Sequence, residues 1–202
     1  MPNSMRFTLI AITVIFVVVG GYHRVLSQQS GERLDRTREG WPLLIGIRLL
    51  GLLTILSTGA FLWKPGWFER TAWPVPLGIR WIGAAGFAGA VAWLLWMFHT
   101  LGRNLTDTVV VRRNAYFVKS GPYRFVRNPM YTGVLMVGLT LGVAIGTWLV
   151  PLSTGIMFIL LALRTRIEER YLIERFGDTY RHMKCTGRFF PTAARQAEEE
   201  RR

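Results

Sequence analysis

Long apolar runs constrain this chain more than any other feature. The clearest run, at residues 41–63, is apolar throughout except for one arginine and a few hydroxyl groups, and tryptophan stands at both of its ends. About 20 apolar residues let a helix cross the hydrocarbon core of a bilayer, and tryptophan is enriched at the membrane interfaces. This run therefore predicts a transmembrane helix. Four more segments predict further spans, at residues 7–21, 75–98, 131–150 and 152–163.

The last two spans are separated only by a short turn, so they predict a helical hairpin, with Pro151 marking the end of its first arm. The second arm reaches Arg164 and Arg166 soon after it begins, and it must therefore leave the hydrocarbon early. Its helical pattern nevertheless continues to Phe176, and Gly177 then ends it. The sequence thus predicts an all-α integral membrane protein with about five transmembrane helices and a cytosolic C-terminal helical segment.

The placement of charge predicts which way the spans run. The chain carries 25 Lys and Arg against 12 Asp and Glu, a formal net charge of +13. Most of the cations follow the first, third and fifth spans, and an excess of Lys and Arg marks cytosolic segments. The C-terminus is therefore expected in the cytosol and the N-terminus outside. Because the cations are divided among loops that lack a recognition helix, an RNA-binding strand motif or a zinc finger, no nucleic-acid partner is expected.

Two cations lie within predicted spans, Arg48 and Arg80. A charged side chain inside a membrane is costly, so it pairs with an acid, lines a polar cavity or extends to the interface. Arg80 is close enough to the start of its span to reach the interface, which leaves Arg48 as the stronger functional candidate. A single cysteine, Cys185, and three histidines without ligand spacing predict that the protein holds no metal.

Two cytosolic segments are longer and more polar than plain connectors need to be, residues 99–129 and the C-terminal tail. In the first, Asn128 and Pro129 predict a helix start, with Asn as the N-cap and Pro at the first helical position. Arg127 and Tyr131 crowd the same helix entry. A helix N-terminus offers free N–H groups and the positive end of the helix dipole, so this entry suits a carboxylate or a phosphate.

The tail begins with a charged helix. Arg164 and Glu168 are four residues apart and share a face, whereas Glu169 is turned about 100° away, so the two glutamates are not expected to hold one small group together. One interpretation is an interfacial helix whose side chains form exposed ion pairs of little energy. We favour a functional site, because Arg164 and Glu168 lie at the membrane surface, where ionisable side chains are costly.

Three ordered strings of residues stand in these two segments. They are Gly121-Pro-Tyr123 with Arg127-x-Pro129-x-Tyr131-x-Gly133, then Glu168-Glu169-x-x-Leu172 with Phe176-Gly177-x-x-Tyr180, then Arg188-Phe-Phe-Pro191. Together they resemble the membrane methyltransferase superfamily that includes isoprenylcysteine carboxyl methyltransferases and phospholipid N-methyltransferases. The resemblance covers roughly the last 90 residues. It implies a methyltransferase core in residues 71–202, with spans three to five and a cofactor-binding C-terminal segment, after two transmembrane helices in residues 1–70.

The resemblance implies methyl transfer from S-adenosylmethionine, bound between the end of the transmembrane bundle and the C-terminal segment. Arg164 and Glu168 would be the catalytic residues, with Arg164 facing the methyl acceptor and Glu168 also holding a polar part of the cofactor. Family members usually have His where this chain has Asn128, and an Asn side chain cannot accept a proton. The implied cofactor-binding residues are Tyr116, Phe117, Val118, Tyr123, Asn128, Pro129, Met130, Tyr131, Glu168 and Glu169.

A lipophilic acceptor that enters from the bilayer, among membrane lipids, fits this interpretation. Methyl transfer from a sulfonium needs no metal, so positioning and electrostatics can supply most of the acceleration. Arg164 could orient a carboxylate acceptor, an amine would need Glu168 or Glu169 as a base, and a thiol is a third candidate. Two other classes stay open, an NADPH-dependent membrane reductase of the sterol-reductase type and a non-catalytic membrane scaffold.

Overall fold

The computed structural model describes residues 1–28, 41–102, 118, 120–177 and 187–191. The secondary structure of these residues is helical, apart from two isolated β-bridges. In chain order the helices are α1 (Asn3–Gln28), α2 (Trp41–Trp63), the 3₁₀ helix η2 (Pro65–Thr71), α3 (Leu77–Leu101), the 3₁₀ helix η4 (Gly121–Arg124), α4 (Pro129–Ile145) and α5 (Leu149–Phe176). The predicted all-α fold is confirmed.

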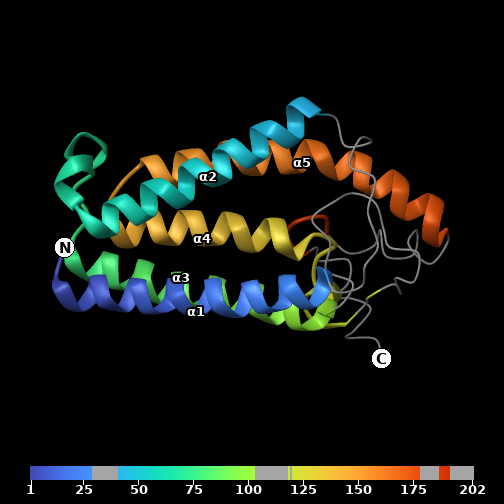
Figure 1. Ribbon diagram of the computed structural model, residues 1–202, viewed down its shortest axis with the longest axis horizontal. Helices are drawn as coiled ribbons and strands as arrows, with labels where there is room; N and C mark the ends of the chain where they lie inside the picture. The colour runs from blue at the N-terminus through green and yellow to red at the C-terminus, as the bar shows by residue number, and fades with distance from the viewer. Residues whose placement is uncertain (29–40, 103–117, 119, 178–186, 192–202) are drawn as a thin grey trace.

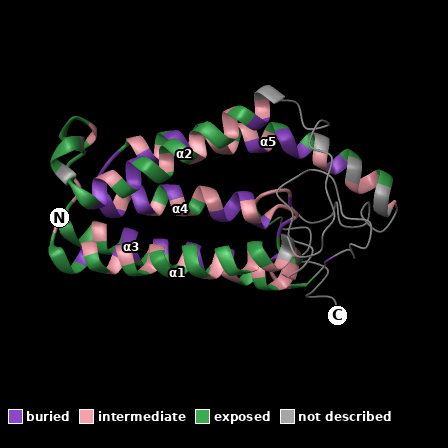
Figure 2. Cartoon of the chain, viewed as in Figure 1, coloured by how far each residue is buried: buried purple, intermediate pink, exposed green. Residues whose placement is uncertain are grey.

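The five α-helices form an elongated bundle with α4 at its centre (Figure 1). α3 and α5 pack against α4, α1 packs against α3, and α2 packs against α5. α4 is consequently buried over much of its length, whereas α1 is largely exposed (Figure 2). One cluster of buried apolar side chains draws on all five helices and includes Met5, Phe61, Phe87, Ile145 and Val150.

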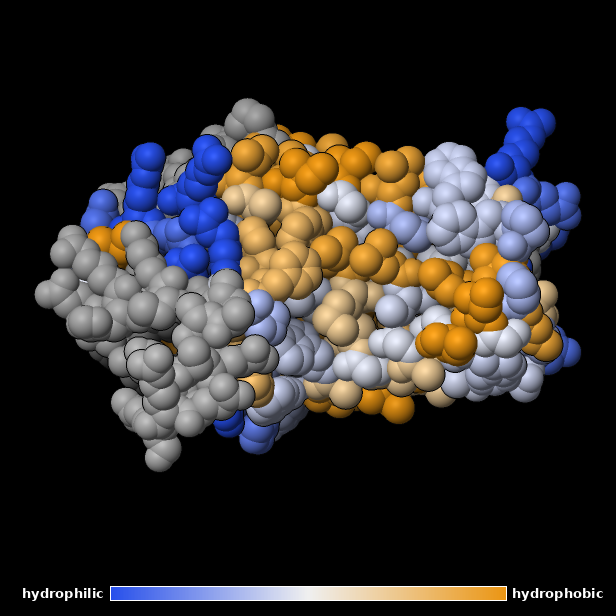
Figure 3. Space-filling model, turned by 180° about the vertical axis from the view of Figure 1, so that it is seen from behind, coloured by the Kyte–Doolittle hydropathy of each residue, from blue (hydrophilic) through white to orange (hydrophobic). Residues whose placement is uncertain are grey.

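In the part of the chain that the structure describes, four helices are long and apolar enough to cross a membrane, namely α1, α2, α3 and α5. α4 is also apolar, and its 17 residues extend about 26 Å at a rise of 1.5 Å per residue. That length is near the lower limit for crossing a bilayer core. The face drawn in Figure 3 carries an apolar belt between two more polar ends. These observations support a multi-pass membrane protein, and the orientation of its termini stays a prediction.

Several helix boundaries differ from those predicted, most clearly those of the first and fourth helices. The helix expected at residues 7–21 covers Asn3–Gln28, because the flanking polar residues continue it beyond the apolar run. The fourth span was expected to reach residue 150, but α4 ends at Ile145 because Gly146 takes a left-handed φ of 74° and stops the helix. Pro151 then lies in the first turn of α5, where the N–H that proline lacks would have no partner within the helix.

Small residues let α3 approach α4 closely. A Cβ atom at Gly83 would lie 2.7 Å from the backbone N of Ala144, and one at Gly86 would lie 2.9 Å from Thr140 Cγ2. Both distances are shorter than real Cβ contacts, so neither position has room for a side chain unless its neighbours move. Close approach of this kind favours helix association in membranes, where van der Waals packing replaces the hydrophobic effect.

The two cations within the spans lie in different surroundings. Arg48 is exposed on α2, and a functional role for it stays a prediction. Arg80 is half-buried in the first turn of α3, and its Nε donates a hydrogen bond to the Val75 carbonyl at 3.1 Å. Its guanidinium lies against Gly146 in the turn between α4 and α5. Arg80 therefore extends toward the end of the bundle, as its place near the end of the span predicts.

The α4–α5 contact can be tested at Gly138, where an added Cβ would overlap the side chain of Thr154. We expect Gly138→Ala to lower the free energy of unfolding by about 1–3 kcal/mol, the usual cost of overpacking. Gly155→Ala is the matched control, because nothing lies within 4 Å of its added Cβ, and we expect it to leave stability unchanged or raise it by up to about 1 kcal/mol. Thermal unfolding in detergent measures both variants, and equal melting temperatures would contradict the close packing.

Candidate active site

Polar side chains gather at the end of the bundle where α4 begins and α5 extends past the other helices (Figure 1). α5 continues to Phe176 and ends at Gly177, as predicted, with a left-handed φ of 53° at the glycine. η4 comes shortly before α4 in the chain. The site is built from the entry of α4 with η4, from the charged half of α5, and from residues 187–191, which we call the strap.

The strap lies along the entry of α4. Val126 and Gly187 form a parallel β-bridge. The Arg127 N–H donates to the Gly187 carbonyl at 3.0 Å, and the Asn128 N–H donates to the Arg188 carbonyl at 3.1 Å. These main-chain hydrogen bonds join two segments that are far apart in the sequence.

Asn128 and Pro129 occupy the N-cap and the first position of α4, as predicted. The Asn128 side chain makes no capping hydrogen bond, however, and its Nδ2 donates to the Arg188 carbonyl at 3.2 Å instead. One turn further along, Thr132 Oγ1 donates to the Phe189 carbonyl at 2.5 Å. The Asn128 amide therefore helps to hold the strap against the helix entry.

Glu168 is held by a phenol and a guanidinium. Tyr131 Oη donates to Glu168 Oε1 at 2.6 Å, and Arg164 Nε lies 3.2 Å from the same oxygen. Tyr131 and Arg164 are only 2% and 7% exposed. The shared face predicted for Arg164 and Glu168 is confirmed, and their ion pair is largely buried rather than solvated. Both contacts favour the ionised carboxylate.

Glu169 has a different set of partners. Arg188 forms a bidentate pair with it, from Nη2 to Oε2 at 2.6 Å and from Nε to Oε1 at 3.2 Å. Arg127 Nη1 lies 3.1 Å from Glu169 Oε1. One buried carboxylate thus connects α5, the entry of α4 and the strap. The prediction that the two glutamates do not hold one small group together agrees with their separate partners.

Tyr123 of η4 brings a second phenol to this end of the bundle. Burial raises the pKa of the Tyr123 hydroxyl, and the negative charge of nearby Glu168 raises it further. The hydroxyl is therefore protonated at neutral pH and can donate a hydrogen bond. Tyr123 and Tyr131 together provide two aromatic rings near the Glu168 carboxylate.

Aromatic rings enclose the polar groups. The ring of Phe189 in the strap lies 6.4 Å from that of Tyr131 and 5.1 Å from that of Phe158 in α5, measured between centroids. On the α3 side, Trp93 Nε1 donates to the Pro129 carbonyl at 2.9 Å. Apolar surroundings lower the local dielectric constant, so the charges of this site act more strongly than they would in water.

The structure brings together four of the predicted site residues, Tyr123, Tyr131, Arg164 and Glu168. Glu169 is adjacent but faces the strap. Tyr116 and Phe117 lie outside the described residues. The other predicted cofactor residues are Asn128 and Pro129 at the helix entry, Met130 half-buried beside them, and Val118, which is buried. The cofactor contacts of all these residues stay predictions.

The sequence predicts no role for Arg188 and Phe189 beyond the string that contains them, and it places Arg127 at the helix entry without naming its partner Glu169. Arg127 stands in the first of the three strings, and Arg188 and Phe189 stand in the third. The spacing of these strings along the sequence does not show that the strap returns to the entry of α4. The one available signal was Glu169, because a carboxylate turned away from Arg164 on a partly buried helix needs cations from elsewhere.

These groups can bind ions of both signs close to apolar surface. Glu168 offers a negative charge, the rings of Tyr123 and Tyr131 offer π faces that attract cations, and Arg164 offers a positive charge that suits an anion. Among the residues that the structure describes, no cluster of His, Cys, Asp or Glu could hold a metal ion. Such a site favours catalysis by positioning and electrostatics.

The strap can be tested at Arg188. We expect Arg188→Ala to lower the free energy of unfolding by about 1.5–3 kcal/mol, because it removes hydrogen bonds to a charged and largely buried Glu169. The control is Arg166→Ala, an exposed arginine of α5, for which a change within about 0.5 kcal/mol is expected. Unfolding in detergent compares the two variants. If both lost equal stability, the proposed link between the strap and α5 would be wrong.

One comparison with known proteins bears on this arrangement. The sequence model of the phospholipid methyltransferase family matches residues 79–179, which is half of the 202-residue chain. The match runs from the first turn of α3 through the end of α5, and it includes Tyr123, Tyr131, Arg164 and Glu168. No curated protein matches the chain. The predicted division at residue 70 stays a prediction.

Proposed function

Because the chain belongs to the phospholipid methyltransferase family, we propose that it transfers a methyl group from S-adenosylmethionine to a lipophilic acceptor. The observation that carries the proposal is the family match over the helices that build the site. The buried charged cluster at the end of an apolar bundle supports it, because ionisable groups at membrane depth are costly and are kept mainly for function.

The groups around Glu168 fit a positively charged cofactor. Tyr131 and Arg164 contact the Glu168 carboxylate, and a carboxylate in apolar surroundings attracts a sulfonium or an ammonium group. We therefore assign Glu168 to a polar or cationic part of S-adenosylmethionine, and Tyr123 and Tyr131 to the same cofactor. When bound, S-adenosylmethionine supplies a sulfonium methyl group, whose bond to sulfur breaks as the bond to the acceptor atom forms, leaving a neutral thioether.

Arg164 faces the acceptor in this proposal. It lies where α5 passes from its apolar half to its charged half and is largely buried, so in this proposal an acceptor from the bilayer enters the site to meet its guanidinium. A guanidinium can bind a carboxylate through two parallel hydrogen bonds and fix its orientation. Correct alignment alone accounts for much of the rate of a displacement in which no covalent enzyme intermediate forms.

Among the open acceptor classes, a carboxylate fits the site best. A carboxylate is already nucleophilic at neutral pH, whereas an amine must first lose a proton to a base. The Glu168 carboxylate already accepts the hydrogen bond from Tyr131 and pairs with Arg164, so we assign it no role as that base. The Asn128 side chain cannot accept a proton. We therefore propose a lipophilic carboxylate that enters from the bilayer.

Two substitutions separate the cofactor from the acceptor. We expect Glu168→Gln to weaken the binding of S-adenosylhomocysteine about tenfold or more, because it removes the negative charge. Arg164→Ala should bind the same ligand with at most a few-fold loss but should abolish turnover of a prenylated cysteine carboxylate. Glu174→Gln, at an exposed glutamate of the same helix, is the control and should change neither property.

Calorimetric titration measures the affinities, and transfer of a radiolabelled methyl group measures turnover. Equal affinity in Glu168→Gln and the unsubstituted protein would contradict the role of Glu168. Turnover in Arg164→Ala at the unsubstituted rate would contradict the role of Arg164. Because Arg164→Ala must still bind S-adenosylhomocysteine, a loss of turnover cannot be mistaken for misfolding.

The pH dependence of the rate tests the acceptor class. A carboxyl group has an ordinary pKa of about 4, so it is ionised throughout the neutral range. We therefore expect the turnover rate to stay within about twofold between about pH 6.5 and 8.5. A rate that rises about tenfold per pH unit would indicate an acceptor that must lose a proton, such as an amine. That result would contradict the carboxylate.

A further inference from the structure

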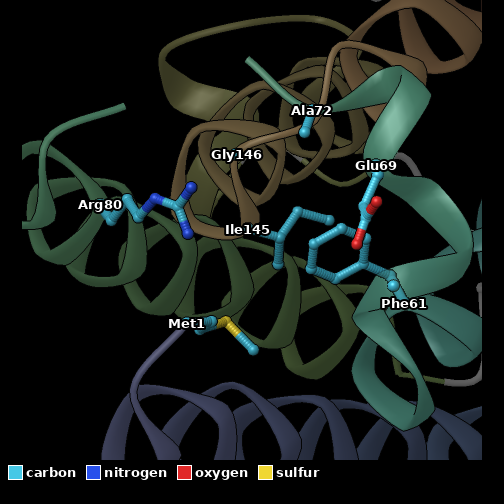
Figure 4. A pocket seen from close by; sticks show the side chains of 8 residues that line it. Met1, Phe61, Glu69, Ala72, Arg80, Ile145 and Gly146 are labelled. Carbon is cyan, nitrogen blue, oxygen red and sulfur yellow. The ribbon is translucent and has the colours of Figure 1, made fainter. Parts of the chain in front are cut away.

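A cavity of about 200 Å³ lies at the other end of the bundle from the Glu168 site. It is an open pocket lined by Met1, the end of α2, η2, the first turn of α3 and the turn between α4 and α5 (Figure 4). Phe61, Ile145 and Met1 give the pocket apolar lining, and the side chains of Arg80 and Glu69 bring charges of opposite sign to it. The cavity thus combines both signs of charge with an apolar lining.

The rim of this cavity is tied together by hydrogen bonds. The Trp73 N–H donates to the Gly146 carbonyl at 3.1 Å, and the Trp148 N–H donates to the Thr71 carbonyl at 3.1 Å. Thr147 Oγ1 donates to Thr71 Oγ1 at 2.8 Å. η2 is therefore fixed to the α4–α5 turn, so the cavity is part of the packed structure rather than a gap beside a loose loop.

Arg80 keeps donors for a ligand. Its Nε is bonded to the Val75 carbonyl, and among the residues that the structure describes no acceptor is recorded for its two terminal nitrogens. The guanidinium lies so close to Gly146 that any side chain there would overlap it. Gly146 also has a left-handed φ of 74°. The guanidinium can occupy this space only because residue 146 is a glycine without a side chain.

Glu69 faces the same space from η2. Figure 4 shows both the Arg80 guanidinium and the Glu69 carboxylate turned toward the interior of the cavity. Within the described part of the chain the two form no ion pair with each other, because their charged atoms are more than 4 Å apart. Two opposite charges that line one cavity without pairing suit a ligand that carries both charges itself.

The cavity lies where the apolar helices end, which is where lipid headgroups are expected. It is next to the start of α3, where that helix enters the apolar region. Exposed tryptophans surround this end of the bundle, and tryptophan is enriched at the membrane–water interface. They are Trp63, Trp67, Trp73 and Trp148. A ligand here is consequently presented by the bilayer itself.

We propose that this cavity binds the headgroup of a zwitterionic phospholipid, with the phosphate on Arg80 and the ammonium group on Glu69. Sites for drug-sized ligands occupy about 300–1,000 Å³, so a cavity of about 200 Å³ suits a headgroup whose acyl chains remain outside. Because it lies at the end of the bundle remote from Glu168, this site is distinct from the proposed acceptor site and does not depend on the proposed function.

The test compares lipid binding by variants of the full chain in detergent. Thermal shift and native mass spectrometry measure binding of phosphatidylethanolamine, phosphatidylglycerol and soluble glycerophosphoethanolamine. Arg80→Gln should weaken the binding of both lipids about tenfold, because it removes the guanidinium that binds the phosphate. Glu69→Gln should abolish the preference for phosphatidylethanolamine over phosphatidylglycerol and leave binding of the latter unchanged. Arg70→Gln, at an exposed cation of η2, is the control and should bind like the unsubstituted protein.

Lipid affinities that are unchanged in Arg80→Gln would overturn the proposal, and so would a retained preference for phosphatidylethanolamine in Glu69→Gln. The second variant alters only an exposed side chain, so it tests the site even if Arg80→Gln does not fold. If glycerophosphoethanolamine bound as tightly as phosphatidylethanolamine, the claim that the ligand is a membrane lipid would be overturned. S-adenosylhomocysteine affinity should be unchanged in both variants, which separates this site from the proposed function.

Discussion

Two consecutive glutamates on α5 determine how the polar end of this bundle is organised. A buried carboxylate is destabilising unless it is paired and hydrogen-bonded. Because Glu168 and Glu169 point in different directions around the helix, each needs its own partners. Glu168 pairs with Tyr131 and Arg164, and Glu169 pairs with Arg127 and Arg188. The entry of α4 and the strap are therefore both held to α5 by charge.

Because their partners differ, the two carboxylates have different roles. Glu169 links three segments and so fixes the geometry around its neighbour. Glu168 keeps its charge in apolar surroundings beside two phenols, which is the arrangement that we propose for binding a cationic cofactor. Glycines on α3 and α4 let α3, α4 and α5 pack closely. Packing of the apolar helices thus supports the geometry of the polar end of the bundle.

The sequence predicts the helices well because apolar length and glycine placement act locally. The span at residues 41–63 and the end of α5 at Gly177 are confirmed, whereas the end of α4 was missed because Gly146 stops the helix inside an apolar run. The four-residue spacing of Arg164 and Glu168 also predicts their contact. The Arg188–Glu169 pair was not predictable in this way, because it joins segments that only the folded chain brings together.

A calorimetric titration of the purified protein in detergent with S-adenosylhomocysteine, with NADPH as the parallel titrant, distinguishes a methyltransferase from a reductase. We expect saturable binding of S-adenosylhomocysteine alone, because the Glu168 site belongs to a member of a methyltransferase family. Binding of NADPH without binding of S-adenosylhomocysteine would contradict the account and favour a membrane reductase. Binding of neither would also contradict it and would favour a non-catalytic protein.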